Sequence, residues 1–278
     1  MTRKIPKYDD YPQIGRVRLD PSLALANSDP LLIRRGLVTG ASLVHKFGRN
    51  SGVPNGTWEG VLQAAAQFYW PQVATTVRIK VGGNAADDAA ASPLGAGAWE
   101  VTVQGIDGVT GLEVSEAIAT AGASASIATT ATFLRVYRAW VSSAGTYTGN
   151  NTAAIVIEDG AGANDMITIL AGEGQSQFCS WTVPAGKTAM LTSVMVQADA
   201  AKAADFRLFT RENANDVTVP FSPKRLRYFW DGVLGNSMLK PVTPILSASA
   251  FTDIWIEARG GGAGTEVSAD MELIVYDD

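Results

Sequence analysis

Few residues in this sequence could support catalysis or bind a metal, and the first of them is a single histidine. His45 is the only histidine among 278 residues and lies in ASLVHKFGRNSG, residues 41–52. A histidine that acts as a base or a metal ligand requires suitable partners, but the chain has no second histidine and no thiol cluster, and the flanking Val44 and Phe47 are suited to apolar contacts. We therefore predict that His45 is structural, beside a corner at Gly48 that leads into the first sheet.

The remaining reactive groups are equally isolated. Cys179, the only cysteine, lies in the alternating segment FCSWTV, residues 178–183, which predicts a small buried side chain rather than a nucleophile. A lone cysteine excludes an internal disulfide and every multi-cysteine metal site. The sequence also has no G-x-x-x-x-G-K-[ST] phosphate loop and no G-x-S-x-G nucleophile elbow. We expect no catalytic residue, no cofactor-binding residue and no enzymatic activity.

Carboxylates are the remaining candidates for metal binding or acid–base chemistry. The adjacent pairs Asp9-Asp10 and Asp87-Asp88 would point to opposite sides of an extended chain, so neither pair forms a site unaided. The loop EDGAGAND, which ends at Asp165, lacks the spaced acidic ligands and the final glutamate of a calcium loop. We expect no metal ligand in this chain.

A cluster of basic and aromatic residues lies in PKRLRYF, residues 223–229. Its arginines and aromatic rings could neutralise phosphates and stack on bases. However, the chain has a net charge of −5, and affinity for nucleic acid grows with the number of phosphates that are contacted. Arginine and aromatic residues are also enriched in protein interfaces. We therefore predict a subunit interface here and no direct contact with nucleic acid.

The first 40 residues differ in character from the rest of the chain. They carry seven Lys and Arg against four Asp and Glu, with several prolines and no sustained period. Such a segment cannot bury enough of itself to offset its ordering entropy, so we predict an extended docking arm over residues 1–40. No secretory signal and no stretch long enough to span a membrane is present. The predicted partner-contact residues are Arg3, Lys4, Lys7, Arg16, Arg18, Arg34, Arg35, Arg225 and Arg227.

The body of the sequence predicts an all-β fold. Alternating segments recur at 99–104, 133–141, 153–159, 166–172, 178–183, 188–197, 205–211, 253–259 and 271–277, with turn signals between them. The one helical spacing, in TWEGVLQAAAQFY at 57–69, is almost equally compatible with a loop packed on a sheet. We predict two β-sandwich or jelly-roll-like units after the extended N-terminal arm: an N-terminal β domain over 41–145 and a jelly-roll-like sandwich over 146–278.

The order of several motifs resembles that of a group of virion structural proteins of tailed bacteriophages. The likeness spans roughly residues 41–278 and rests on VHKFGRN, GAGAWEVTVQGID, FLRVYRAWV, GEGQSQFCSWTVPAGKTAML and DIWIEAR followed by VSADMELIVYDD. This resemblance implies a capsid decoration or cement protein that stabilises the head by bridging major capsid subunits. It also implies a homo-oligomer, in particular a homotrimer, located on the head surface of the virion and made in the cytoplasm of the bacterial host.

Two alternatives to this function remain open. The protein could be a neck, tail or fibre component that contacts the host surface. It could also be a glycan-binding jelly-roll protein, because its tryptophans suffice to build a platform for a sugar. The candidates for this platform are Trp140, Trp181, Trp230 and Trp255.

Overall fold

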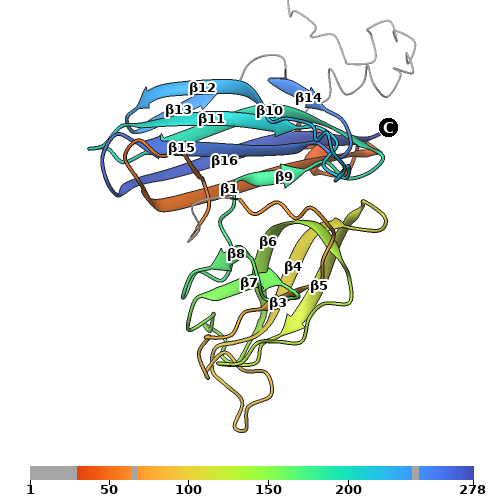
Figure 1. Ribbon diagram of the computed structural model, residues 1–278, viewed down its shortest axis with the longest axis vertical. Coiled ribbons are helices and arrows are strands. Elements are labelled where there is room, and N and C mark those ends of the chain that lie inside the picture. The colour runs from red at the N-terminus through yellow and green to blue at the C-terminus, as the bar shows by residue number, and fades with distance from the viewer. Residues whose placement is uncertain (1–29, 64–67, 240–243) are drawn as a thin grey trace, which may run out of the picture.

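The computed structural model describes residues 30–63, 68–239 and 244–278, and nearly all of its regular structure is β. This confirms the predicted all-β class. Figure 1 shows two β units: a broad sandwich and a smaller unit beside it. None of the helices in the described residues is long and apolar enough to cross a membrane.

The sandwich consists of two five-stranded sheets. Sheet I has the order β1 (Ala41–Val53), β16 (Thr265–Asp277), β10 (Lys187–Ala198) and β13 (Asn236–Leu239), and β14 (Leu246–Ala248) also pairs with β10. Sheet II has the order β12 (Arg225–Val233), β11 (Ala204–Arg211), β15 (Asp253–Gly260) and β2 (Glu59–Gly60), and β9 (Ser180–Thr182) also pairs with β15. The strands predicted at 188–197, 205–211, 253–259 and 271–277 are therefore confirmed.

Alternating residues fill the space between these two sheets. On β16, Met271 and Leu273 are fully buried, whereas the intervening Glu272 is not. Sheet II contributes a second set of fully buried residues, among them Leu208 on β11 and Ile256 on β15. This is the period of two that a half-buried strand requires, and it places the main hydrophobic core inside the sandwich.

The smaller unit is inserted into the sandwich between β2 and β9, and we call residues 75–176 the inserted unit. One three-stranded sheet has the order β3 (Val77–Ile79), β7 (Ile155–Asp159), β8 (Asp165–Ile169). The other has the order β5 (Glu113–Ala119), β4 (Ala98–Asp107), β6 (Phe133–Ala144). The segment 126–131 links the two sheets, because the Thr129 amide donates to Val77 and the Thr130 amide donates to Glu116.

Strand pairing divides the chain differently from the predicted domains at 41–145 and 146–278. β1 lies in the first predicted domain but pairs along its length with β16, at the other end of the chain. Conversely, β7 and β8 lie in the second predicted domain but pair with β3. The physical reason is that turn composition marks where a strand ends, whereas the partner of a strand depends on long-range contacts. The turn-rich segment 142–151 is the end of β6 and the loop that follows it within the inserted unit, rather than a boundary.

Three local predictions also differ from the structure. Residues 57–63 and 68–69 form no helix, and β2 occupies Glu59–Gly60; residues 64–67 lie outside the described residues. Within the predicted extended arm, Pro30–Arg34 forms the short helix α2, which packs on β1 with Ile33 buried. Gly48 lies inside β1 rather than at a corner. A Cβ atom at Gly48 would lie 2.2 Å from the Val61 carbonyl oxygen, so a close approach of two chain segments explains this glycine.

Candidate interface and the network that supports it

Exposed apolar side chains are concentrated at one edge of the sandwich. Eight of the 19 exposed large hydrophobic residues in the described parts of the chain lie within residues 217–238, which we call the edge segment. They are Val217, Val219, Phe221, Leu226, Tyr228, Phe229, Leu234 and Met238. Exposed apolar side chains that gather into a patch mark interaction sites in proteins.

Strand β12 forms the centre of the edge segment and is the edge strand of sheet II. Leu226, Tyr228 and Phe229 are 53%, 40% and 42% exposed. The pairing of β12 with β11 is irregular at two places. On β11, one irregularity lies between Ala204 and Phe206 and the other between Leu208 and Phe209. Bulges of this kind bend an edge strand and limit further strand pairing, so the side chains of β12, rather than its backbone, form the available surface.

The predicted contact residues Arg225 and Arg227 lie on this strand and are exposed. Glu212 accepts from both: its Oε1 lies 3.2 Å from Nη1 of Arg225 and 3.5 Å from Nη2 of Arg227. Nε of Arg227 also donates to Oγ1 of Thr210 at 2.7 Å. These bonds fix the two guanidinium groups beside the exposed rings of β12, the combination that protein interfaces favour.

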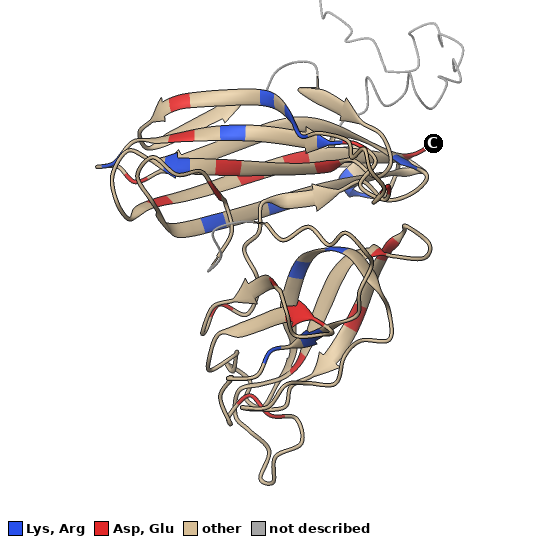
Figure 2. Cartoon of the chain, viewed as in Figure 1, with Lys and Arg blue, Asp and Glu red and all other residues tan. Residues whose placement is uncertain are grey.

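The other predicted contact residues are not brought to the same place. Arg34 and Arg35 are exposed at the end of α2, which packs on β1 of sheet I, whereas β12 belongs to sheet II. Arg3, Lys4, Lys7, Arg16 and Arg18 lie outside the described residues. Figure 2 shows Lys and Arg interspersed with Asp and Glu over the strands of the sandwich, rather than one face of a single sign.

A ladder of charged and aromatic side chains supports β12 from the neighbouring strands. Glu257 on β15 is 6% exposed and accepts from Arg207 and Lys224, both at 3.1 Å. The Arg207 guanidinium lies 3.5 Å from the ring centroid of Trp58, and Phe229 meets the same indole edge to face. Cation–π and aromatic contacts of this kind restrict the orientation of the rings that they join.

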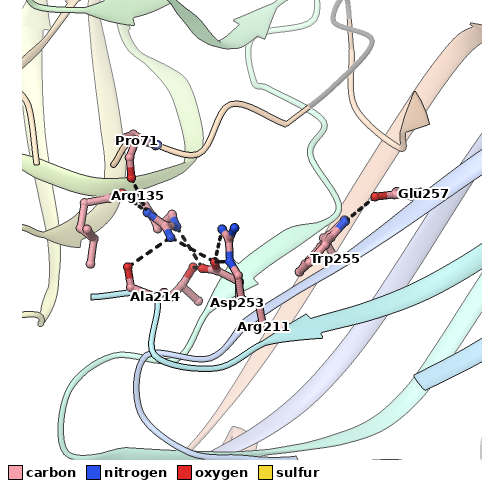
Figure 3. A network of polar contacts seen from close by, with 9 residues as sticks. Pro71, Arg135, Arg211, Ala214, Asp253, Trp255 and Glu257 are labelled. Atoms are coloured by element: carbon pink, nitrogen blue, oxygen red, sulfur yellow. Dashed lines mark hydrogen bonds and ion pairs between the residues drawn. The ribbon is translucent and has the colours of Figure 1, made fainter. Parts of the chain in front are cut away.

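The sandwich and the inserted unit are joined by a buried ionic network, shown in Figure 3. Arg135 of β6 reaches Asp253 of β15 with two bonds of 3.0 and 3.1 Å, and both side chains are almost completely buried. Arg211 donates to the same carboxylate at 2.9 Å, and Thr182 donates to it at 2.7 Å. Because both oxygens of the buried Asp253 carboxylate accept from these donors, this network holds the two units together.

A cleft of about 270 Å³ lies beside this network and extends toward the edge segment. Arg135 and Arg211 line it together with Trp70, and both guanidinium groups stack near the Trp70 ring, at 5.2 and 4.9 Å. Phe221 of the edge segment lines the same cleft. The edge segment is therefore continuous with the junction between the two units.

A second contact at the junction contains a buried lysine. Lys46 on β1 places its ammonium 4.1 Å from the ring centroid of Tyr137 on β6, and the Tyr137 hydroxyl donates to Glu113. Burial lowers the pKa of Lys46 from 10.5 to about 7; the Glu113 carboxylate opposes this shift, and Arg138 adds to it. Burial raises the pKa values of Tyr137 and Cys179 far above their usual ranges. No ion pair to Lys46 is present among the described residues.

His45 has a partner that the local sequence could not indicate. Its Nε2 atom lies 2.9 Å from Oδ1 of Asp270 on the adjacent strand β16, and the histidine side chain is 53% exposed. The pair lines a hollow that also contains Ser176 and Arg138. The contact links neighbouring strands of one sheet, an arrangement that suits the predicted structural role.

The acidic candidates make separate structural contacts. Asp87 is buried and accepts from the backbone amides of Ala98, Thr152 and Ala153 at 2.8 to 2.9 Å. Asp88 instead accepts from the amide of Ala90. In the EDGAGAND loop, Asp159 accepts from Ala163 and Asn164, whereas Asp165 pairs with Lys80. Asp9 and Asp10 lie outside the described residues. No group of three or more potential metal ligands occurs in the parts of the chain that the structure describes.

The predicted tryptophan platform is not formed. Trp181 is 1% exposed and lies inside the sandwich. Trp255 is 2% exposed and packs against Trp70, and Trp230 is 7% exposed and packs against Tyr228. Cys179 is completely buried, as its alternating segment predicted. Of the four predicted platform residues, only Trp140, on β6 of the inserted unit, is partly open to solvent.

Comparisons with known proteins identify no family. No protein-family model matches the sequence, and a search of curated proteins gave no match. Among solved structures, the infectious bursal disease virus Gt strain aligns at 7% identity over 86% of this chain and 77% of that chain, with a TM-score of 0.19. The Gx strain aligns at 8% identity over 85% and 77%, with a TM-score of 0.21. TM-scores this low carry no argument about function.

Proposed function

We propose that this protein is a structural component of a bacteriophage virion, a capsid decoration or cement protein on the head surface that bridges major capsid subunits and associates with copies of itself. The ordered motif series over residues 41–278 supports the class of protein. The concentration of exposed apolar residues and arginines in the edge segment is the observation that supports a bridging role. A clamp that binds the shell shifts the equilibrium away from rupture by its binding free energy, summed over many sites.

The copy number of the protein in purified particles, relative to the major capsid protein, tests this function. Hundreds of copies are expected for a decoration protein. About a dozen copies would replace this proposal with a neck or tail role, and absence from particles would refute a virion role. Particles that lack the protein should assemble but release DNA at lower temperature, in proportion to the occupancy that is lost.

The edge segment can be tested by its binding to capsids that lack the protein. The double variant Leu226→Glu and Phe229→Glu places two charges in the proposed contact. We expect at least about 2 kcal/mol of lost binding free energy, or roughly 30-fold weaker binding, because anchor residues dominate interface energies. Val109→Glu changes a residue of the inserted unit that is 86% exposed and serves as the matched control. Equal binding of the double variant and the control would refute the edge segment as the contact.

The predicted docking arm requires its own variant. Residues 30–34 pack on β1, so the deletion should stop before Pro30. A protein that lacks residues 1–29 is expected to remain folded but to bind expanded capsids more weakly, because an arm of this composition is ordered only against a partner. Binding as tight as that of the whole chain would refute the role of the arm.

A further inference from the structure

A polar hollow on the inserted unit lies apart from the edge segment and shares Arg138 and Gln175 with the hollow at His45. It has a volume of about 500 Å³ and is formed by the end of β6, the loop 146–150 and the turn 173–175. Two aromatic side chains line it: Trp140, which is half-buried, and Tyr147, which is fully exposed. Trp140 is the one predicted platform residue that remains accessible to a ligand.

The backbone of this hollow is held in place by its own hydrogen bonds. The Val141 amide donates to the Gly174 carbonyl at 2.8 Å, and the Gly174 amide donates to Oδ1 of Asn151 at 3.0 Å. Gly174 has a φ of +69°, and a Cβ atom there would lie 2.4 Å from Nδ2 of Asn150. A site fixed in this way does not have to be ordered by its ligand, which lowers the cost of binding.

Several polar groups in the hollow have no partner among the residues that the structure describes. No hydrogen bond in this part of the chain involves the side chain of Tyr147, Gln175 or Ser143, although all three line the hollow. The Arg138 guanidinium lies 4.8 Å from the centroid of the Trp140 ring and makes no ion pair there. Glu173 already has two partners: its Oε2 accepts from Gln177 at 2.9 Å, and its Oε1 lies 3.9 Å from Nη1 of Arg49. An amide, two hydroxyls, a guanidinium and a carboxylate thus provide both donors and acceptors.

We propose that this hollow binds a short oligosaccharide. A pyranose ring has an apolar C–H face, which packs on an aromatic ring, and a rim of hydroxyls, which require both donors and acceptors. The hollow offers aromatic surface at Trp140 and Tyr147, bounded by the Gln175 amide and by the Arg138 guanidinium that lies over one face of the Trp140 ring. Specific small-molecule sites generally combine aromatic surface with a small number of precisely placed polar groups. This inference goes beyond the proposed virion function and does not depend on it.

Saturation-transfer NMR on the full chain tests the site with three probes: chitotriose, maltotriose and rhamnose. We expect transfer to at least one probe, with at least tenfold weaker binding in Tyr147→Ala and Trp140→Ala. Phe221→Ala removes an exposed aromatic ring in the edge segment and is the matched control, which should bind as the wild type does. Tyr147 is fully exposed, so its variant keeps the test valid even if Trp140→Ala fails to fold. No transfer to any probe, or unchanged binding in Tyr147→Ala, would overturn the proposal.

Discussion

Replacement of Lys46 by methionine should change how the stability of the protein depends on pH. The Lys46 pKa falls from 10.5 to about 7 on folding, chiefly through burial. Between these values the unfolded chain binds the proton more tightly than the folded chain does, so the free energy of unfolding rises as pH increases. The destabilisation is fully present below pH 7 and disappears above 10.5.

The magnitude follows from the shift, at about 1.4 kcal/mol for each pKa unit. At pH 7, where the lysine of the folded protein is half-protonated, its burial lowers the free energy of unfolding by on the order of 4 kcal/mol. At pH 9 this decrease is about 2 kcal/mol, so wild-type protein should gain about 2 kcal/mol between these pH values. The methionine variant lacks this gain. It also loses a cation–π contact with Tyr137 that is worth about 0.5 to 2 kcal/mol.

Urea unfolding at pH 7, 8 and 9 measures these differences. We expect Lys46→Met to be at least as stable as wild type at pH 7, with this advantage reduced by about 2 kcal/mol at pH 9. Lys80→Met is the matched control, because Lys80 is partly exposed and pairs with Asp165 on the surface; its pH dependence should follow that of the wild type. Parallel pH profiles for wild type and Lys46→Met would refute the reasoning.

Three further predictions concern stability, each measured by urea or thermal unfolding. Asp253→Ala should lower the free energy of unfolding by about 3 to 5 kcal/mol, because it leaves the buried Arg135 charge without its carboxylate. A decrease below about 1 kcal/mol would contradict a role for the network at the junction. His45→Gln should lower the free energy of unfolding by no more than about 1 kcal/mol and leave particle assembly intact, since the His45–Asp270 contact is solvent-exposed. A variant that folds but loses a hydrolytic or metal-dependent activity would contradict the structural role. Gly48→Ala should prevent normal folding, because the added Cβ would overlap the Val61 carbonyl. Gly52→Ala meets no atom within 4 Å and should be tolerated. Equal solubility of the two variants would contradict this prediction by showing that β1 can shift to make room.

The sequence predicted the strands that are buried on one face, because burial of alternate residues leaves a local period of two. β12 was not predicted as a strand, since five consecutive residues from Arg225 to Phe229 are exposed and a strand without a buried face has no such period. The helical spacing at 57–69 was misleading because its aromatic residues pack over sheet II: Trp58 meets Phe229 and Phe68 meets Phe178. A fixed spacing of apolar residues does not distinguish these contacts from a helical face.

The candidate site was predicted only in part for a related reason. The cluster at 223–229 indicated an interface from composition alone, and Arg225 and Arg227 are exposed beside aromatic rings there. Partners that are distant in sequence could not be inferred: Asp270 lies 225 residues from His45, and Asp253 lies 118 residues from Arg135. The hollow at Trp140 likewise depends on the turn at Gly174, which comes from another part of the inserted unit.

The pairing of β1 with β16 has a consequence for the order of events during synthesis. The first strand of the sandwich must wait for the last, because β16 is made after all the other strands of both units. The inserted unit, whose strands pair among themselves, can fold earlier. Until β16 arrives, both edges of β1 are unpaired, and the long separation between the two strands makes this step slow. A newly made chain therefore cannot complete its sandwich until β16 has been made, which delays any assembly through the edge segment until that point.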